Sequence, residues 1–244
     1  MTDAPTLGGR IDAIRRRMAD AARRAGRDPG EIALIGVTKT HPAEQVAAAR
    51  AAGLADVGEN RVQEAEDKRA QLGADGDALR WHLIGHLQRN KARRAVQLFD
   101  LIHSVDSLKL AEALSRLAEE ERGGPQPILL QLNVSGEASK EGFDVRGGLA
   151  SAGWEPFLAA ARAIAALPML EIRGLMTIAP YSDDLDGVVR PCFRALRQAR
   201  DELIRLIPAA SWRELSMGMS GDFEAAIEEG ATLVRVGTAI FGAR

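Results

Sequence analysis

The chain alternates between short hydrophobic runs and longer stretches in which hydrophobic and charged residues recur at helical spacing. The short runs have the length of strands and carry almost no polar alternation, which is typical of strands covered on both faces. Strands that alternate with helices in this way form a parallel sheet with right-handed crossovers. We predict eight strands, at residues 32–38, 55–58, 81–85, 100–104, 128–134, 171–178, 214–217 and 233–237.

The stretches between these runs predict helices. PAEQVAAARAA at residues 42–52 begins with proline, a residue favoured at the start of a helix. Residues 61–72 and 107–121 are rich in alanine, leucine and charged residues and predict two longer helices. A glycine-rich stretch at residues 142–156 predicts a surface loop instead.

An amphipathic helix is also predicted before the first strand, ending near Gly26. Its hydrophobic positions recur at helical spacing among several arginines. These positions are Ile11, Ile14 and Met18. We interpret this helix, together with the turn that completes residues 1–30, as a lid or cap on the strands.

Eight such units fit either a closed (β/α)₈ barrel or an open, doubly wound sheet. The number of units favours the barrel, and 244 residues are about the length that one barrel needs. No G-x-G-x-x-G motif follows the first strand, which removes the main support for a dinucleotide-binding open sheet. We therefore predict an α/β protein with a TIM-barrel fold, a single domain over residues 1–244 without an internal linker.

The charge and residue composition indicate which kinds of partner the protein does not bind. The 32 Lys and Arg residues against 34 Asp and Glu give a net charge of −2, without the basic surplus of a nucleic-acid-binding protein. No run reaches the ~18 to 20 apolar residues of a membrane span, and the first ten residues lack a signal-peptide core. The only cysteine, Cys192, cannot form an internal disulfide. We expect a cytoplasmic protein that binds neither nucleic acid nor membranes.

Lys39 directly follows the first predicted strand. In a barrel this position lies at the rim formed by the carboxyl ends of the strands, where reactive groups gather. A lysine that is partly withdrawn from water loses its proton more easily, and its amine can then form a Schiff base with an aldehyde. The alternative is that Lys39 is only a soluble end to an apolar strand.

A second signal follows the seventh strand, within residues 215–231. Gly218, Met219 and Ser220 lead into a helix that opens at Asp222. Glycines let backbone N–H groups approach a ligand, and a helix N-terminus presents unpaired donors, so this turn predicts an anion-binding cradle. The alternative is that Ser220 or Asp222 only caps the helix.

The last strand contains Arg235 and ends at Gly237 and Thr238. The loops after strands seven and eight are the recurrent phosphate site of TIM barrels, so this turn and the preceding one reinforce each other. A buried arginine needs a partner. A ligand would provide one for Arg235, and so would a salt bridge to a neighbouring strand.

Other polar residues give weaker signals. Asn60, after the second strand, predicts either a ligand contact or a helix cap. His82 and His86 lack a third ligand and the H-E-x-x-H spacing, so we predict no metal site. One cluster of basic residues predicts a solvated helix face, with contact to an anion or a partner as the alternative. Its members are Arg89, Lys91, Arg93 and Arg94.

Several stretches together resemble the pyridoxal 5′-phosphate (PLP) homeostasis proteins, also called the YggS or PROSC family. That family is similar in fold to the N-terminal barrel of alanine racemase, and the resemblance covers nearly the whole chain. The stretch at 142–156 looks longer than the family leads us to expect. The matching stretches are IGVTKTHP, VGENRVQE, WHLIGHLQRNK, IHSVDS, LQLNVSGEASKEGF, IRGLMTI, LSMGMSGDFEAAIEEG and VRVGTAIFGAR.

The resemblance implies a role for each candidate residue. Lys39 would form the Schiff base with PLP, Arg235 would face the pyridine nitrogen, and Asn60 would lie beside the ring. A cation at the pyridine nitrogen disfavours its protonation and weakens the ring as an electron sink. The phosphate would be held by Ser220, Gly237 and Thr238, with the backbone of Gly218 and Met219 nearby.

The resemblance therefore implies a monomeric PLP carrier with little or no turnover, which passes the cofactor to apo-enzymes. The alternative is a single-domain PLP-dependent amino-acid racemase. In the related racemases the second acid–base group is a tyrosine of a further domain, whereas the only tyrosine here is Tyr181. A third hypothesis is a cofactor-free lysine aldolase whose anion cradle holds a sugar phosphate.

Overall fold

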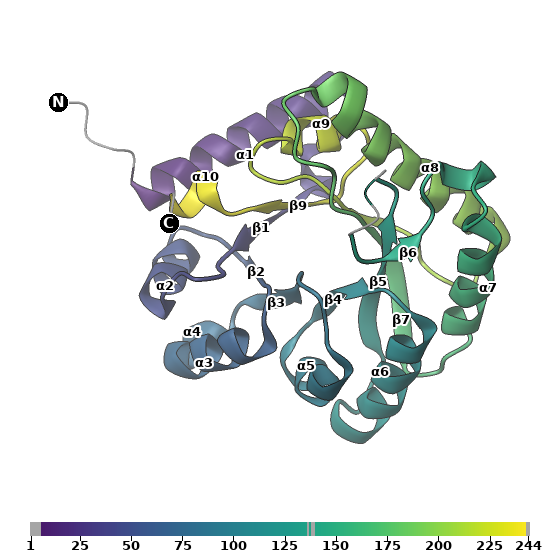
Figure 1. Cartoon of the computed structure of the whole chain (residues 1–244). Helices are drawn as coiled ribbons and strands as arrows, with labels where there is room; N and C mark the ends of the chain where they lie inside the picture. Colours follow the sequence, from purple (N-terminus) through teal and green to yellow (C-terminus); the bar gives the residue numbers. More distant parts are fainter. Residues whose placement is uncertain (1–5, 136, 138–139, 243–244) are drawn as a thin grey trace.

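The computed structural model describes residues 6–135, 137 and 140–242. Residues 1–5 lie outside this range, as do 136 and 138–139 within the matching stretch LQLNVSGEASKEGF and 243–244 at the end of VRVGTAIFGAR. Eight parallel strands form a closed barrel, viewed roughly along its axis in Figure 1. Their order is β4-β3-β2-β1-β9-β8-β7-β5, and pairing of β4 with β5 closes the ring. The predicted (β/α)₈ TIM-barrel fold is confirmed.

Each predicted strand has an observed counterpart displaced by two residues or fewer at either end. The fifth strand begins earlier than predicted, and it includes Pro127. The strands are β1 (Ala33–Val37), β2 (Asp56–Glu59), β3 (Arg80–Leu83), β4 (Leu101–Val105), β5 (Gln126–Asn133), β7 (Leu170–Met176), β8 (Glu214–Ser216) and β9 (Leu233–Val236).

Helices surround the barrel, and the three predicted with clear ends are found within one residue of their expected bounds. The Ser107 hydroxyl caps α6 by accepting a hydrogen bond from the backbone N–H of Leu110. No helix in the described part of the chain is long and apolar enough to cross a bilayer. The α-helices are α1 (Leu7–Arg24), α2 (Ala43–Ala51), α3 (Val62–Leu72), α4 (Ala74–Asp77), α5 (Ala92–Leu98), α6 (Leu108–Glu121), α7 (Trp154–Ala165), α8 (Arg190–Leu206), α9 (Phe223–Glu228) and α10 (Thr238–Phe241).

The N-terminal helix α1 belongs to the outer ring of helices, so our interpretation of it as a lid is wrong. It packs against α9, α10 and α2 along the side of the barrel (Figure 1). The Arg10 guanidinium donates a hydrogen bond to the carbonyl of Ile240 in α10. Because α10 has only four residues, α1 covers the flank that a longer helix after β9 would cover.

The stretch at 142–156 is more ordered than the predicted surface loop. Phe143 and Asp144 form a short strand, β6, which pairs in parallel with β5. A 3₁₀ turn, η3 (Gly148–Ala150), follows, and α7 begins at Trp154. Trp154 is buried in the hydrophobic core, which anchors this segment despite its many glycines.

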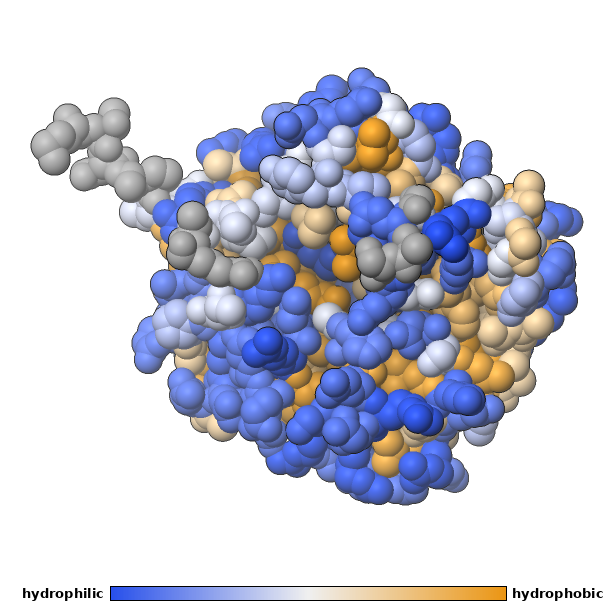
Figure 2. Space-filling model, in the orientation of Figure 1, coloured by the Kyte–Doolittle hydropathy of each residue, from blue (hydrophilic) through white to orange (hydrophobic). Residues whose placement is uncertain are grey.

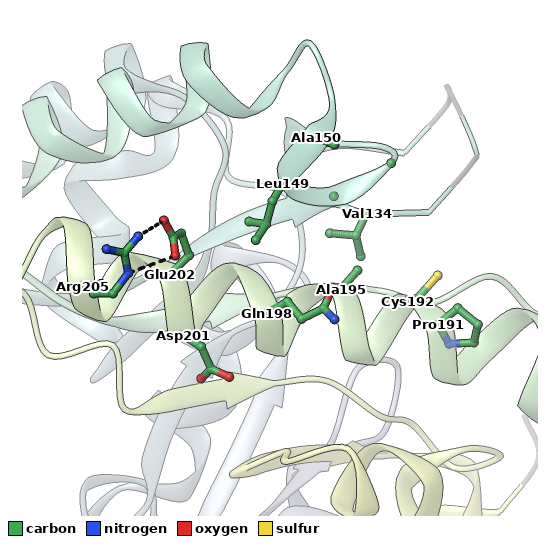
Figure 3. Close-up of a pocket in the computed structure, with 12 residues that line it drawn as sticks. Val134, Leu149, Ala150, Pro191, Cys192, Ala195, Gln198, Asp201, Glu202 and Arg205 are labelled. Atoms are coloured by element: carbon green, nitrogen blue, oxygen red, sulfur yellow. Dashed lines mark hydrogen bonds and ion pairs between the residues drawn. The ribbon is translucent and has the colours of Figure 1, made fainter.

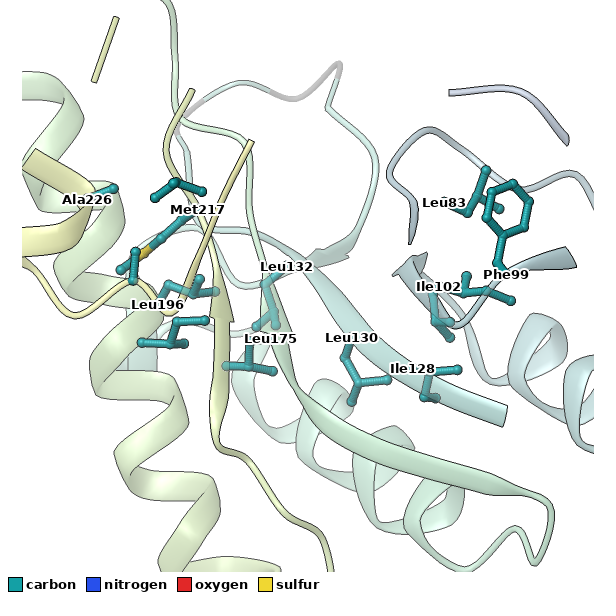
Figure 4. Packing of buried hydrophobic residues seen from close by; sticks show 14 of the residues in the cluster. Leu83, Phe99, Ile102, Ile128, Leu130, Leu132, Leu175, Leu196, Met217 and Ala226 are labelled. Carbon is teal, nitrogen blue, oxygen red and sulfur yellow. The ribbon is translucent and has the colours of Figure 1, made fainter. Parts of the chain in front are cut away.

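The hydrophobic core has two parts. The larger lies between strands and outer helices, where Figure 4 shows Leu175 of β7 between Leu130 of β5 and Leu196 of α8. The smaller lies inside the barrel. Branched apolar residues usually fill a TIM-barrel interior, but here buried polar side chains occupy much of it. The interior apolar residues are Ile35, Leu101, Leu129, Met176 and Leu233.

Candidate functional site

A cavity of about 940 Å³ opens at the carboxyl ends of the barrel strands. Figure 2, in the orientation of Figure 1, shows a hollow near the centre of this face, bordered by both hydrophilic and hydrophobic residues. Gly218 is absent from its lining, which includes the other seven predicted site residues. These are Lys39, Asn60, Met219, Ser220, Arg235, Gly237 and Thr238.

Hydrogen bonds on both sides fix the turn that carries Lys39. The Thr38 hydroxyl donates to Glu59 Oε1 over 2.6 Å, and the Thr38 backbone N–H donates to the Gly58 carbonyl over 3.0 Å. Thr40 has a φ of 66°, an uncommon conformation for a β-branched residue, and its N–H donates to the Glu64 carboxylate. Lys39 is therefore held between two anchored residues at the edge of the cavity.

A buried lysine on α3, which the sequence did not single out, supports this turn. Lys68 Nζ donates to the Thr38 carbonyl over 2.6 Å and to the carboxylates of Glu59 and Glu64 over 2.7 Å each. Burial raises the pKa of Glu59, although hydrogen bonds from Lys68 and Thr38 oppose the shift. In the sequence, the only signal for Lys68 is its position four residues after Glu64, which is typical of an ion pair on one helix face.

Gly218 begins the turn after β8, and the structure gives a packing role for it, not the predicted contact with phosphate. Gly218 has a φ of 93°, and a Cβ there would lie 2.6 Å from Cβ of Ala226. This glycine therefore lets α9 pack closely against the turn. Asp222 precedes α9, but its carboxylate accepts a hydrogen bond from the N–H of Met219 within the turn.

Ser220 joins the turn after β8 to the start of α10. Its hydroxyl oxygen accepts hydrogen bonds from the backbone N–H groups of Gly237, over 3.3 Å, and Ala239, over 3.4 Å. A Cβ on Gly237 would lie 3.3 Å from Cβ of Val37, a tight contact. The hydroxyls of Ser220 and Thr238 thus line one part of the cavity, and hydroxyl donors suit a phosphate group.

Arg235 is buried, with 4% of its surface exposed. Its Nη1 donates to Ser216 Oγ over 2.6 Å, and its Nη2 donates to the Thr177 carbonyl over 2.8 Å. Burial lowers the pKa of Arg235 to about 10, so the guanidinium is still protonated at neutral pH. Both partners are neutral groups. Among the described residues Arg235 forms no salt bridge, so the alternative of a salt bridge to a neighbouring strand is not found.

The weaker candidates are also placed. Asn60 lines the cavity, and α3 begins after Arg61 without a side-chain cap, so Asn60 does not have the alternative role of capping that helix. His86 lies at the rim, 3.3 Å from Asp106 and 3.2 Å from Glu141. Within the described residues, no three His, Cys, Asp or Glu side chains form a group that could hold a metal ion.

A second hollow, of about 910 Å³, lies between α8 and the segment around η3 (Figure 3). It shares no lining residue with the cavity at the barrel mouth. Arg205 and Glu202 form an ion pair of 2.6 Å on its wall, and burial raises the pKa of the Cys192 thiol. The cavity at the mouth, in contrast, combines a lysine, a buried cation and a donor-rich turn.

Comparisons with known proteins agree with this geometry. The family model "Alanine racemase, N-terminal domain" matches residues 10–244. A pyridoxal phosphate homeostasis protein from Pseudomonas aeruginosa is 45% identical over 241 residues, 98% of this chain and 96% of that protein. PipY from Synechococcus elongatus, solved with PLP bound, is 40% identical with a TM-score of 0.83, covering 97% of this chain and 100% of PipY.

An alanine racemase from Streptomyces coelicolor has a TM-score of 0.72 but only 20% identity, so it shares the fold alone. The match covers 97% of this chain and 59% of the racemase chain. The much higher identity to the homeostasis proteins, over nearly their full length, separates this chain from the racemases. It belongs to the family of pyridoxal phosphate homeostasis proteins, as its sequence motifs indicated.

Proposed function

We propose that this protein binds PLP at the mouth of the barrel and acts in PLP homeostasis, with little or no turnover. The observation that carries the proposal is the convergence of Lys39, the Ser220 turn and Arg235 on one cavity. The PLP-bound structure of PipY, at 40% identity, supports the choice of ligand. A volume of about 940 Å³ is also within the usual range for a small-molecule site.

The residues present fit the chemical groups of PLP. When bound, PLP supplies an aldehyde that forms a Schiff base with an amine, and its pyridine ring can serve as an electron sink. Lys39 offers the amine. The hydroxyls of Ser220 and Thr238, both in the cavity lining beside Gly237, offer donors to a phosphate. Met219 lies in the same turn as Ser220, and Asn60 lines the cavity, where its amide would lie beside the ring.

Arg235 determines how far the site can support amino-acid chemistry. Its guanidinium is fixed by Ser216 and by the Thr177 carbonyl, and with a pKa of about 10 it keeps its proton at neutral pH. Beside a bound cofactor this cation would donate a hydrogen bond to an unprotonated ring nitrogen and would disfavour protonation there. Without that proton the ring withdraws electrons weakly, which favours retention of the cofactor over carbanion chemistry.

The alternative function, a single-domain racemase, needs a second acid–base group facing Lys39. Tyr181 lines the same cavity and is the only tyrosine of the chain. Its side chain is 98% exposed, however, so water surrounds the phenol instead of the packed neighbours that would position a catalytic group. This exposure favours the carrier over the racemase.

The proposal extends to the setting in which the cofactor is held. The protein acts as a monomer in the cytoplasm and hands PLP to apo-enzymes that require it. The single cysteine, buried and without a disulfide partner, supports a reducing compartment. The open position of the cavity at the end of the barrel supports transfer, because the ligand leaves without unfolding a strand.

Borohydride reduction of the PLP-loaded protein tests the proposal. Reduction converts a Schiff base into a stable pyridoxyl-lysine, and mass spectrometry then locates the modified residue. We expect the adduct on Lys39 and its loss in Lys39→Ala. Lys91→Ala, which removes a lysine outside the cavity lining, is the matched control and keeps the adduct. Modification of a different lysine, with Lys39 unmodified, contradicts the site.

A further inference from the structure

A continuous chain of buried hydrogen bonds runs from Arg235 through the interior of the barrel. Arg235 Nη1 contacts Ser216 Oγ at 2.6 Å, and Ser216 Oγ contacts Nδ1 of His103 at 2.9 Å. His103 Nε2 contacts Nδ1 of His82 at 2.9 Å, and His82 Nε2 contacts Oδ1 of Asp56 at 3.0 Å. We call these five residues the interior chain.

The interior chain connects the two ends of the barrel. Arg235 lines the cavity at the mouth, whereas Asp56 and His82 line a cavity of about 310 Å³ at the opposite end. There Arg80 donates to Oδ2 of Asp56 over 2.6 Å, so the two oxygens of this carboxylate have different partners. All five members of the chain are at most 5% exposed.

With both histidine rings neutral, the chemistry at the two ends sets the direction of every hydrogen bond between them. A guanidinium can only donate, and a carboxylate can only accept. His82 must therefore carry its hydrogen on Nε2, and with neutral rings its bare Nδ1 accepts from His103 Nε2–H. His103 Nδ1 is then bare and accepts from the Ser216 hydroxyl. Burial lowers the pKa of His103 well below its ordinary value, which supports a neutral ring for His103.

This direction matters for Arg235 because it commits the Ser216 hydroxyl hydrogen to His103. A lone pair of Ser216 Oγ then faces the Arg235 N–H, and no other donor in the chain competes for that oxygen. Buried polar chains are costly unless every member is satisfied, and apolar residues would fill a barrel interior at lower cost. The polar interior therefore points to a role in holding the cation of the site.

We propose that Asp56, His82 and His103 are positioning residues, which orient Ser216 so that it holds the Arg235 guanidinium against the cofactor's ring nitrogen. The inference rests on the proposed function, because it assumes that PLP places its ring beside Arg235. It goes beyond that function because it gives a positioning role to Asp56, which lies at the opposite end of the barrel from the PLP site.

The substitution Asp56→Asn provides a sharp test because it reverses the chain without changing its shape. Arg80 can only donate, so it takes the single amide oxygen and leaves the amide NH₂ facing His82. His82 must then accept on Nε2, carry its hydrogen on Nδ1 and donate to His103. His103 in turn donates to Ser216, whose oxygen now receives hydrogens from both His103 and Arg235.

Nitrogen NMR of the full chain with isotope-labelled histidine reads these tautomers directly, without any cofactor. We expect Nε2–H on both His82 and His103 in the wild type, and Nδ1–H on both in Asp56→Asn. A doubly protonated His82 in the wild type overturns the proposed direction. Unchanged tautomers in Asp56→Asn overturn the role of Asp56.

The link to the cofactor is tested with PLP that carries a labelled ring nitrogen. In Ser216→Ala and Asp56→Asn we expect the ring-nitrogen resonance to shift, while the phosphorus resonance of the phosphate stays in place. Ser104→Ala is the matched control, since this buried serine donates to the Gly85 carbonyl instead of joining the chain. Ring resonances that move no more than in Ser104→Ala overturn the inference.

The two proposals fail in different ways. If borohydride leaves no adduct on Lys39, the proposed function fails, and the histidine tautomers still test the interior chain. If the adduct forms on Lys39 but neither substitution moves the ring-nitrogen resonance, PLP binding stands and the positioning role fails.

Discussion

Lys68 Nζ lies 2.7 Å from Oε1 of Glu59, directly behind the strand end that carries Lys39, and both side chains are buried. The same ammonium donates to the carbonyl of Thr38, the residue before Lys39. Helix α3 is therefore connected through one cation to the turn at the cavity edge. Removing that cation leaves the Glu59 carboxylate buried without a charged partner.

We predict that Lys68→Met destabilises the fold by about 3 to 5 kcal/mol at neutral pH, as expected for a buried charge that loses its partner. Glu59 has a raised pKa in the fold, so its protonated form contributes stability that is lost as pH rises through that pKa. The loss in Lys68→Met should therefore be smaller in acid than at neutral pH. Urea unfolding measures both values.

The double variant Lys68→Met/Glu59→Leu is the control, because it removes both charges together. We expect it to recover most of the stability at neutral pH, since a buried pair replaced by apolar residues is often neutral or stabilising. A double variant as unstable as Lys68→Met would assign the loss to packing and not to the unpaired carboxylate.

The phosphate cradle is tested with Ser220→Ala and Thr238→Ala. Each substitution should cost about 1.5 to 3 kcal/mol of binding energy, or roughly tenfold to a hundredfold in PLP affinity, because a donor to a charged group is lost. Equilibrium binding followed by absorbance measures the change. Pyridoxal, which lacks the phosphate, is the control ligand, and its affinity should change little. An equal loss for both ligands would contradict the cradle.

Racemisation of free amino acids should be absent. Typical enzymes turn over about 1 to 10³ times per second. We expect no inversion of L-alanine on that scale by the PLP-loaded protein, because under the proposed function Arg235 would oppose protonation of the ring nitrogen, and Tyr181 is exposed. Chiral chromatography after long incubation checks this, with a known alanine racemase as the positive control. Turnover in the enzymatic range would favour the racemase alternative.

The fold should lose stability in mild acid because of His103. In the unfolded chain this histidine takes up a proton near its ordinary pKa of 6.5, whereas burial lowers its pKa well below that value in the fold. The unfolded state then binds more protons, so stability falls as pH drops below about 6.5, by up to about 1.4 kcal/mol per pH unit. Unfolding curves of the wild type and His103→Asn between about pH 7 and 5 compare the slopes. Equal slopes would contradict this assignment.

The barrel topology and the position of the candidate site at the carboxyl ends of the strands were predictable from the sequence. Apolar runs identify strands covered on both faces; Lys39 and Thr238 directly follow two of them, and Ser220 lies three residues after a third. Because the carboxyl ends of parallel strands meet at one rim, proximity follows from the topology. The PLP ligand itself came from resemblance to a family, because spacing alone left a sugar-phosphate aldolase open.

The supporting residues were not predictable, for a physical reason. Lys68, Ser216 and His103 act through partners that are mostly far away in the sequence, and their pairing depends on how the strands and helices are placed in the barrel. The reason for Gly218 could not be told from the sequence. A glycine there fits both a backbone contact to phosphate and the close packing of α9 that the structure shows. The segment at 142–156 was predicted as a surface loop because of its glycines. The sequence did not show that Trp154 packs into the core and anchors the end of this segment.

The place of α1 in the outer ring has a consequence for how the chain reaches its native state. Arg10 and its acceptor Ile240 are separated by 230 positions, so this helix emerges from the ribosome long before the surface on which it docks exists. Until α9 and α10 are synthesised, its apolar stripe is exposed to chaperones and to other nascent chains. A circular permutant that moves this helix behind α10 would place docking partners next to each other in sequence and shorten that period of exposure.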